Sequence, residues 1–122
     1  MPTTEHIVTA YTDELLDLAR TITEMGGLVE KALSNAVDAL VRSDHELALA
    51  TVAADKKVDA MQHLIDEKAV SIIARRQPMA TDLRLVIASI HDANDLERIG
   101  DMAKSTARRS TQFEGLAMSS QF

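Results

Sequence analysis

A helical pattern of apolar residues that continues without a break constrains the fold of this chain most strongly. From about Thr4 to Val41, apolar side chains recur every three or four residues, and charged ones fall on the opposite side of a helix. The apolar stripe consists of Ile7, Tyr11, Leu15, Leu18, Ile22, Met25, Val29, Ala32, Ala36 and Leu40. We therefore expect one long amphipathic helix at the start of the chain.

Two further helices are expected after it. Ser43 and Glu46 form a capping-box pattern, which predicts that a second helix begins there. Pro78 disfavours helical geometry for the residue before it, so this helix should end at the proline and a third should run over about residues 79–112. The 122 residues include only four glycines and two prolines, so the helices have few breaking points.

Short turns between long helices make neighbouring helices antiparallel. The predicted fold is therefore all-α, an up-down-up three-helix bundle over residues 1–114. Residues 115–122 show no sustained helical period and contain Gly115 and a Ser-Ser-Gln run, so we expect a flexible tail or a truncated linker there.

Composition excludes several classes of protein. Lys and Arg number 13 against 19 Asp and Glu, a net charge of −6, and a binder of nucleic-acid phosphates needs the opposite sign. The chain has no cysteine, which excludes a disulfide framework and a thiolate zinc site. It shows neither a signal-peptide pattern nor an apolar run long enough to span a membrane, so we expect a cytoplasmic protein.

Four carboxylates stand at matching distances from the second turn. Asp59 precedes Pro78 by 19 residues and Glu97 follows it by 19, while Asp55 and Asp101 are each 23 residues away. In an antiparallel hairpin the members of each pair lie level. The i,i+4 spacing within each acid-x-x-x-acid repeat also places both acids on one helical face. The four side chains are therefore expected to converge at one height.

Such a convergence points to a cation. Glu97 and Asp101 fall on the apolar side of their helix, whereas Asp55 and Asp59 fall at the flank of theirs, which indicates a half-buried site at the rim of the bundle. Unpaired carboxylates there carry a desolvation cost, and oxygen ligands suit Mg, Mn, Ca or ferric iron. Two ordinary solvated acid pairs are the alternative.

Residues of the first helix approach the same level. Gly26 and Gly27 lie inside that helix, where glycine is unfavourable, which suggests close packing or a bend at this point. Glu30 is a lesser candidate for the site and is expected to face solvent.

Four stretches of the sequence resemble the PhoU family of phosphate-signalling regulators. They are residues 25–30 (MGGLVE), 55–59 (DKKVD), 76–84 (RQPMATDLR) and 95–101 (DLERIGD). The resemblance implies a three-helix bundle whose acidic repeats hold metal ions, commonly iron or zinc, and it assigns that role to Asp55, Asp59, Glu97 and Asp101. It also implies a regulator that restrains the phosphate-starvation response, acting between the phosphate ABC transporter ATPase and a sensor histidine kinase.

Members of that family usually carry two bundles in tandem, whereas this sequence holds one copy of each motif. A truncated product or a single-repeat member is therefore expected. The third helix shows more apolar residues than its two neighbouring helices can bury. Beyond the apolar stripe that faces those helices, it carries Leu85, Ala88, Leu96, Ile99 and Ala103. We therefore expect a homodimer, with Leu96 and Ile99 near the contact.

The leading functional prediction is a non-enzymatic, metal-binding regulator of phosphate uptake, whose metal is Fe, Mn, Mg or Zn. A purely structural oligomerisation module and a carboxylate-metal enzyme are the alternatives. The sequence has no glycine-rich phosphate loop and no recognisable pair of a nucleophile with a histidine base. Arg84, Arg98 and Arg109 form a predicted basic strip that could steer an acidic partner.

Overall fold

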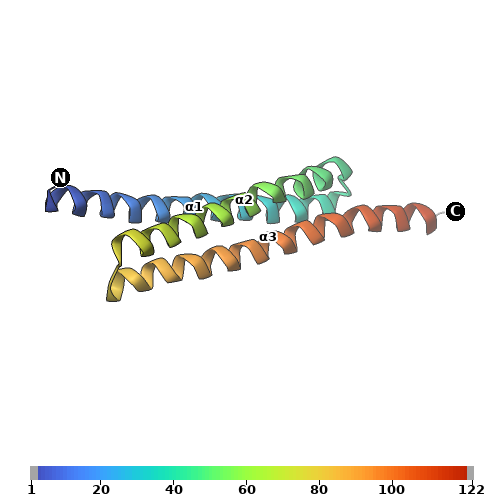
Figure 1. The fold of residues 1–122 in the computed structure, drawn as a ribbon. Helices are drawn as coiled ribbons and strands as arrows, with labels where there is room; N and C mark the ends of the chain where they lie inside the picture. Colours follow the sequence, from blue (N-terminus) through green and yellow to red (C-terminus); the bar gives the residue numbers. More distant parts are fainter. Residues whose placement is uncertain (1–2, 121–122) are drawn as a thin grey trace.

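Three long helices make up the computed structural model, which describes residues 3–120 and the side chains of residues 3–112. Helix α1 spans Thr4–Arg42, α2 spans His45–Arg76 and α3 spans Ala80–Ser120. Each helix packs against both others, in up-down-up order (Figure 1). The predicted all-α three-helix bundle is confirmed, and none of the described helices combines the length and apolar character needed to cross a membrane.

Helix α3 continues past the predicted end at residue 112 and reaches Ser120. Its last turns extend beyond the turn that joins α1 to α2 (Figure 1). The helix therefore includes most of the segment that the sequence suggested as a tail. The rest of that segment, residues 121–122, lies outside the described part of the chain.

The second helix begins one residue later than the capping-box pattern predicts. Ser43 adopts a left-handed conformation with φ 54° and ends α1, its backbone N–H donating to the Ala39 carbonyl. Asp44 then caps α2, and its carboxylate accepts a hydrogen bond of 3.1 Å from the Leu47 N–H. The prediction of Ser43 as the N-cap is thus wrong by one residue, because Ser43 closes the preceding helix instead.

The second turn follows the expectation from Pro78. Gln77 ends α2 in a left-handed conformation with φ 47°, and its N–H donates to the Ile73 carbonyl at 3.1 Å. Helix α3 begins two residues after the proline. This turn fixes how α2 and α3 align along their length.

The core has two parts that differ in side-chain size. The larger part contains long aliphatic side chains from all three helices: Leu18, Met25, Val29, Val58, Ile65, Ile72 and Val86, with Ala69 and Ala93 between them. The smaller part consists of alanines: Ala36, Ala39, Ala48, Ala103 and Ala107. Because alanine side chains are short, the helices can approach more closely in the alanine part.

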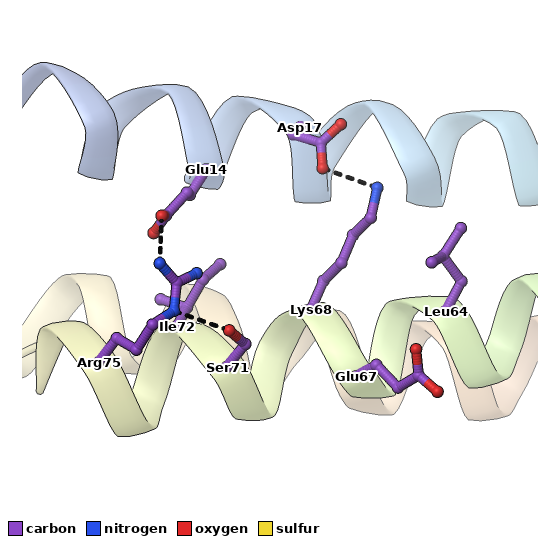
Figure 2. A pocket seen from close by; sticks show the side chains of 8 residues that line it. All are labelled: Glu14, Asp17, Leu64, Glu67, Lys68, Ser71, Ile72 and Arg75. Atoms are coloured by element: carbon purple, nitrogen blue, oxygen red, sulfur yellow. Dashed lines mark hydrogen bonds and ion pairs between the residues drawn. The ribbon is translucent and has the colours of Figure 1, made fainter.

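Ionic contacts join α1 to α2 around a pocket of about 230 Å³ (Figure 2). The Glu14 carboxylate accepts hydrogen bonds from Arg75 and Arg76, at 2.8 Å and 2.9 Å for the shortest contacts. One turn along, the Lys68 ammonium lies 2.7 Å from Asp17. These ion pairs offset charges on the pocket wall, which also includes the Glu67 carboxylate.

Candidate metal centre

The two acidic repeats come together across the α2–α3 contact. Asp55 and Asp59 lie on α2, Glu97 and Asp101 lie on α3, and the charges of Asp55 and Asp59 are close enough to raise the pKa of the Glu97 carboxyl. The equal offsets from the second turn therefore predicted the relative height of the repeats correctly. A hydrogen bond of 2.6 Å from the Gln62 amide to Asn94, one turn away, joins the same two helices.

The burial of the four side chains differs from the prediction. Asp55 is only 5% exposed, whereas Asp59 and Glu97 are half-buried and Asp101 is exposed. The sequence placed Glu97 and Asp101 on the buried side and Asp55 at the flank, and this assignment is wrong for Asp55 and Asp101. A helical wheel describes one helix alone, and it does not show how closely the neighbouring helix covers each position.

Gly100 explains the burial of Asp55. A Cβ atom placed on Gly100 would stand 3.5 Å from Oδ1 of Asp55 and 3.1 Å from Cγ1 of Val58, so α3 lies close to α2 here and a methyl group on Gly100 would press against Val58. Of the two expectations for Gly26 and Gly27, close packing or a bend, close packing is wrong, since a Cβ at either position would meet nothing within 4 Å. The glycine that matters for the site lies on α3.

Asp55 has a cationic partner that the sequence analysis missed. The Lys104 ammonium of α3 lies 3.5 Å from Oδ2 of Asp55. The pKa of the Asp55 carboxyl is raised, mainly by burial and next by the charge of Asp59, while Lys104 acts in the opposite direction. The signal was present in the sequence, because Lys104 lies on the same face of α3 as Gly100 and Asp101, three to four residues away.

Glu97 and Asp101 interact along α3. The pKa of the Glu97 carboxyl is raised, first by a hydrogen bond with the Asp101 carboxyl, then by burial and then by the neighbouring negative charges. The two carboxyls stand one helical turn apart, so their charges repel each other when both are ionised. The centre therefore favours either a proton or another positive charge between these two groups.

The four carboxylates are ligands of the kind that a hard cation prefers, although their side chains are not arranged to coordinate one ion together. Within residues 3–112, no group of three or more Asp, Glu or His side chains stands ready to hold one metal ion. Carboxylate oxygens are nonetheless the preferred ligands of such ions, and the Lys104 ammonium beside Asp55 shows that positive charge is favoured there. Glu30 is exposed, as expected, and so is His63.

Comparison with known proteins agrees with the motifs. A family profile of the PhoU domain matches residues 22–110. The phosphate-specific transport system accessory protein PhoU homolog of Rhizobium meliloti is 49% identical over 104 residues, which are 85% of this chain and 44% of that protein. The corresponding homolog of Caulobacter vibrioides is 44% identical over 107 residues, or 88% of this chain and 46% of that protein.

The phosphate-specific transport system accessory protein PhoU of Escherichia coli is 41% identical over 108 residues, or 88% of this chain and 45% of that protein. The chain thus spans less than half the length of these relatives. The domain match covers most of the bundle, including both acidic repeats and the close contact at Gly100. On these grounds the chain belongs to the PhoU family.

Proposed function

We propose that this chain is a non-enzymatic regulatory component of a bacterial phosphate-uptake system. The observation that carries the proposal is the identity of 41–49%, over most of the chain, to accessory proteins of phosphate-specific transport. The proposed place of action is the cytoplasm. There the bundle acts as an adaptor between the ATPase of the phosphate ABC transporter and a sensor histidine kinase.

The proposed adaptor surface lies on the outer face of α3. Arg84, Arg98 and Arg109 are all exposed on a chain whose net charge is −6, and Arg98 lies 3.9 Å from the exposed carboxylate of Asp95. Such a strip supports association with an acidic surface, chiefly by steering the encounter. The Arg84→Glu/Arg98→Glu variant should therefore capture one or both partners more weakly than the wild type, and salt should weaken wild-type capture. Undiminished capture that does not depend on salt contradicts this assignment.

We also propose that Asp55, Asp59, Glu97 and Asp101 bind a metal ion, with Fe, Mn, Mg and Zn as candidates. A bound cation would supply the positive charge that holds these mutually repelling carboxylates together. The proposal is supported by the level placement of the two repeats, the buried carboxylate of Asp55 and the acidic charges around Glu97. The protein residues would position the ion and link α2 to α3, and we assign them no catalytic step.

The metal proposal can be tested by melting. The wild-type protein should gain thermal stability with at least one of these four ions, because a ligand that binds only the folded state stabilises it by mass action. The Glu97→Gln/Asp101→Asn variant should lose most of that gain. Equal gains in both proteins would show that the ion binds elsewhere.

The regulatory proposal needs a test in cells. The chain, expressed in an Escherichia coli strain that lacks its own PhoU protein, should lower the activity of a phosphate-starvation reporter when phosphate is plentiful. A version with two copies joined by a linker serves as the matched control for the length of the relatives. If neither version changes the reporter at normal protein levels, and neither captures the transporter ATPase or the kinase, the proposed function is wrong.

A further inference from the structure

The Lys104–Asp55 contact lies inside the proposed metal centre. The ammonium of Lys104 is 3.5 Å from Oδ2 of Asp55, and the Lys104 side chain keeps 30% of its surface exposed while that of Asp55 keeps 5%. Lys104 therefore places its positive charge beside the most buried of the four carboxylates.

We propose that Lys104 is the built-in counter-ion of this centre, and that a metal ion binds by displacing its ammonium group from Asp55. This inference rests on the proposed metal site. It explains why the four carboxylates converge without forming a ready ligand set, since Lys104 already satisfies the carboxylate that a cation would need most.

The two oxygens of Asp55 have different neighbours. Oδ1 lies beside Gly100, where an added Cβ atom would stand 3.5 Å away, at ordinary contact distance. Oδ2 is the oxygen that Lys104 contacts. A cation that binds Asp55 through Oδ2 would therefore compete with the ammonium for the same oxygen.

The Lys104 ammonium can also move away from Asp55 into solvent. Its side chain is long and flexible and keeps part of its surface in contact with solvent, so the ammonium can move outward while the aliphatic stem stays on the bundle. An apo state with Lys104 on Asp55 and a loaded state with Lys104 in solvent would then exchange. The strength of the Lys104–Asp55 ion pair would then determine how tightly a cation must bind to displace the ammonium.

This role predicts opposite effects on two quantities. Removing the charge with Lys104→Met should lower the melting temperature of the metal-free protein, because Asp55 stays buried without a partner. The same change should tighten binding of Mn²⁺ by at least about tenfold, because a unit charge within a few ångströms opposes the incoming ion at moderate effective dielectric. An ion pair that is only structural would produce the first effect without the second.

Two matched variants test whether the change in affinity comes from the Lys104 charge beside Asp55 or from the loss of any positive charge on the protein. Lys104→Arg keeps the positive charge beside Asp55 and should bind Mn²⁺ more weakly than Lys104→Met does. Lys56→Met removes an exposed lysine that lies next to Asp55 in the sequence but faces solvent, and it should change affinity by less than about threefold because solvent screens its charge. Calorimetric titration with Mn²⁺ and melting of the metal-free proteins supply both quantities.

A second measurement follows the ammonium itself. Acetylation of Lys104 by a water-soluble reagent, followed by mass spectrometry, should accelerate when Mn²⁺ is present, while acetylation of Lys56 should not. If the wild type and Lys104→Met bind Mn²⁺ equally well, the inference about Lys104 is wrong while the metal site stands. If neither protein binds Mn²⁺, the inference and the Mn²⁺ site are both wrong.

Discussion

Gly100 of α3 packs tightly against Val58 of α2, since a Cβ at Gly100 would stand 3.1 Å from Cγ1 of Val58. Both residues are buried. A valine within a helix has one strongly preferred rotamer, so its methyl group cannot easily turn away. The contact therefore fixes the spacing of α2 and α3 at the height of the two acidic repeats.

The first prediction concerns this contact. Gly100→Ala should lower the free energy of unfolding by about 1 kcal/mol, because the overlap with Val58 costs more than alanine gains in helix propensity. Combining it with Val58→Ala should recover part of the loss, because the second change removes the methyl group that the first one meets. Denaturant unfolding of the four proteins measures the coupling between the two positions.

Gly27→Ala is the matched control for Gly100→Ala. Gly27 lies in the middle of α1, is exposed and has no neighbour within 4 Å of a built Cβ. Its replacement should raise the free energy of unfolding by about 0.5–1 kcal/mol through helix propensity alone. A stabilising effect at both positions would mean that α3 can move away from α2 freely, and that Gly100 does not set their spacing.

Much of the bundle was predictable from the sequence because its signals are local. Apolar spacing identified the three helices, and Pro78 fixed the turn from which the level of the acidic repeats could be counted. The burial of Asp55 was not predictable in the same way. It depends on how closely α3 approaches, which is set by the missing side chain of Gly100 on a different helix.

The second prediction concerns pH. The pKa of the Glu97 carboxyl is raised in the folded protein, so the folded state binds more protons than the unfolded state at pH values between about 4.3 and that raised pKa. The stabilising contribution of protonated Glu97 is therefore fully present below about pH 4.3 and is lost as pH rises through the folded pKa. Metal-free Glu97→Gln should melt about 1–3 °C above the wild type at pH 7.

The advantage of Glu97→Gln should shrink as the solution is acidified from pH 7 toward pH 4, where the wild-type carboxyl takes up its proton. Glu30→Gln removes the same charge from an exposed position and should show a much smaller pH-dependent difference. If the advantage of Glu97→Gln stays constant from pH 7 to pH 4, the negative charge of the Glu97 carboxylate is not its cause.

The third prediction concerns Glu14, whose carboxylate should stabilise the protein at neutral pH and lose that effect in acid. The pKa of the Glu14 carboxyl is lowered, first by the hydrogen bond from Arg76, with burial acting against it and Arg75 adding to it. Its stabilising contribution is present above about pH 4.3 and is lost as pH falls through the lowered pKa. Glu14→Gln should cost about 1 kcal/mol at pH 7, and the cost should decrease below about pH 4.

Melting of the wild type and Glu14→Gln from pH 7 to pH 2 tests this prediction. Glu24→Gln is a suitable control, because Glu24 is an exposed glutamate on the same helix. A cost at Glu14 that is unchanged at low pH would show that packing of the side chain, and not its charge, joins α1 to the end of α2.

The fourth prediction is a homodimer, and the structure changes the residues that should form it. Ala103 is fully buried inside the bundle and Leu96 packs against the core, so neither is free for a second chain. Ile99 does keep exposed surface, at 37%, as do Leu85 at 56% and Met102 at 65%. We therefore expect the contact to centre on these three side chains of α3.

Light scattering after size exclusion at micromolar concentration should give twice the mass of one chain, because two-fold pairing is the commonest way for identical chains to cover an apolar surface. Ile99→Lys should weaken the dimer by at least about tenfold, because it places a charge at the centre of the contact. Val70→Lys adds the same charge to another exposed apolar position, on α2, and should leave the mass unchanged. A wild-type mass equal to one chain, without binding of a dye that detects apolar surface, would show that α3 needs no second copy to cover these side chains.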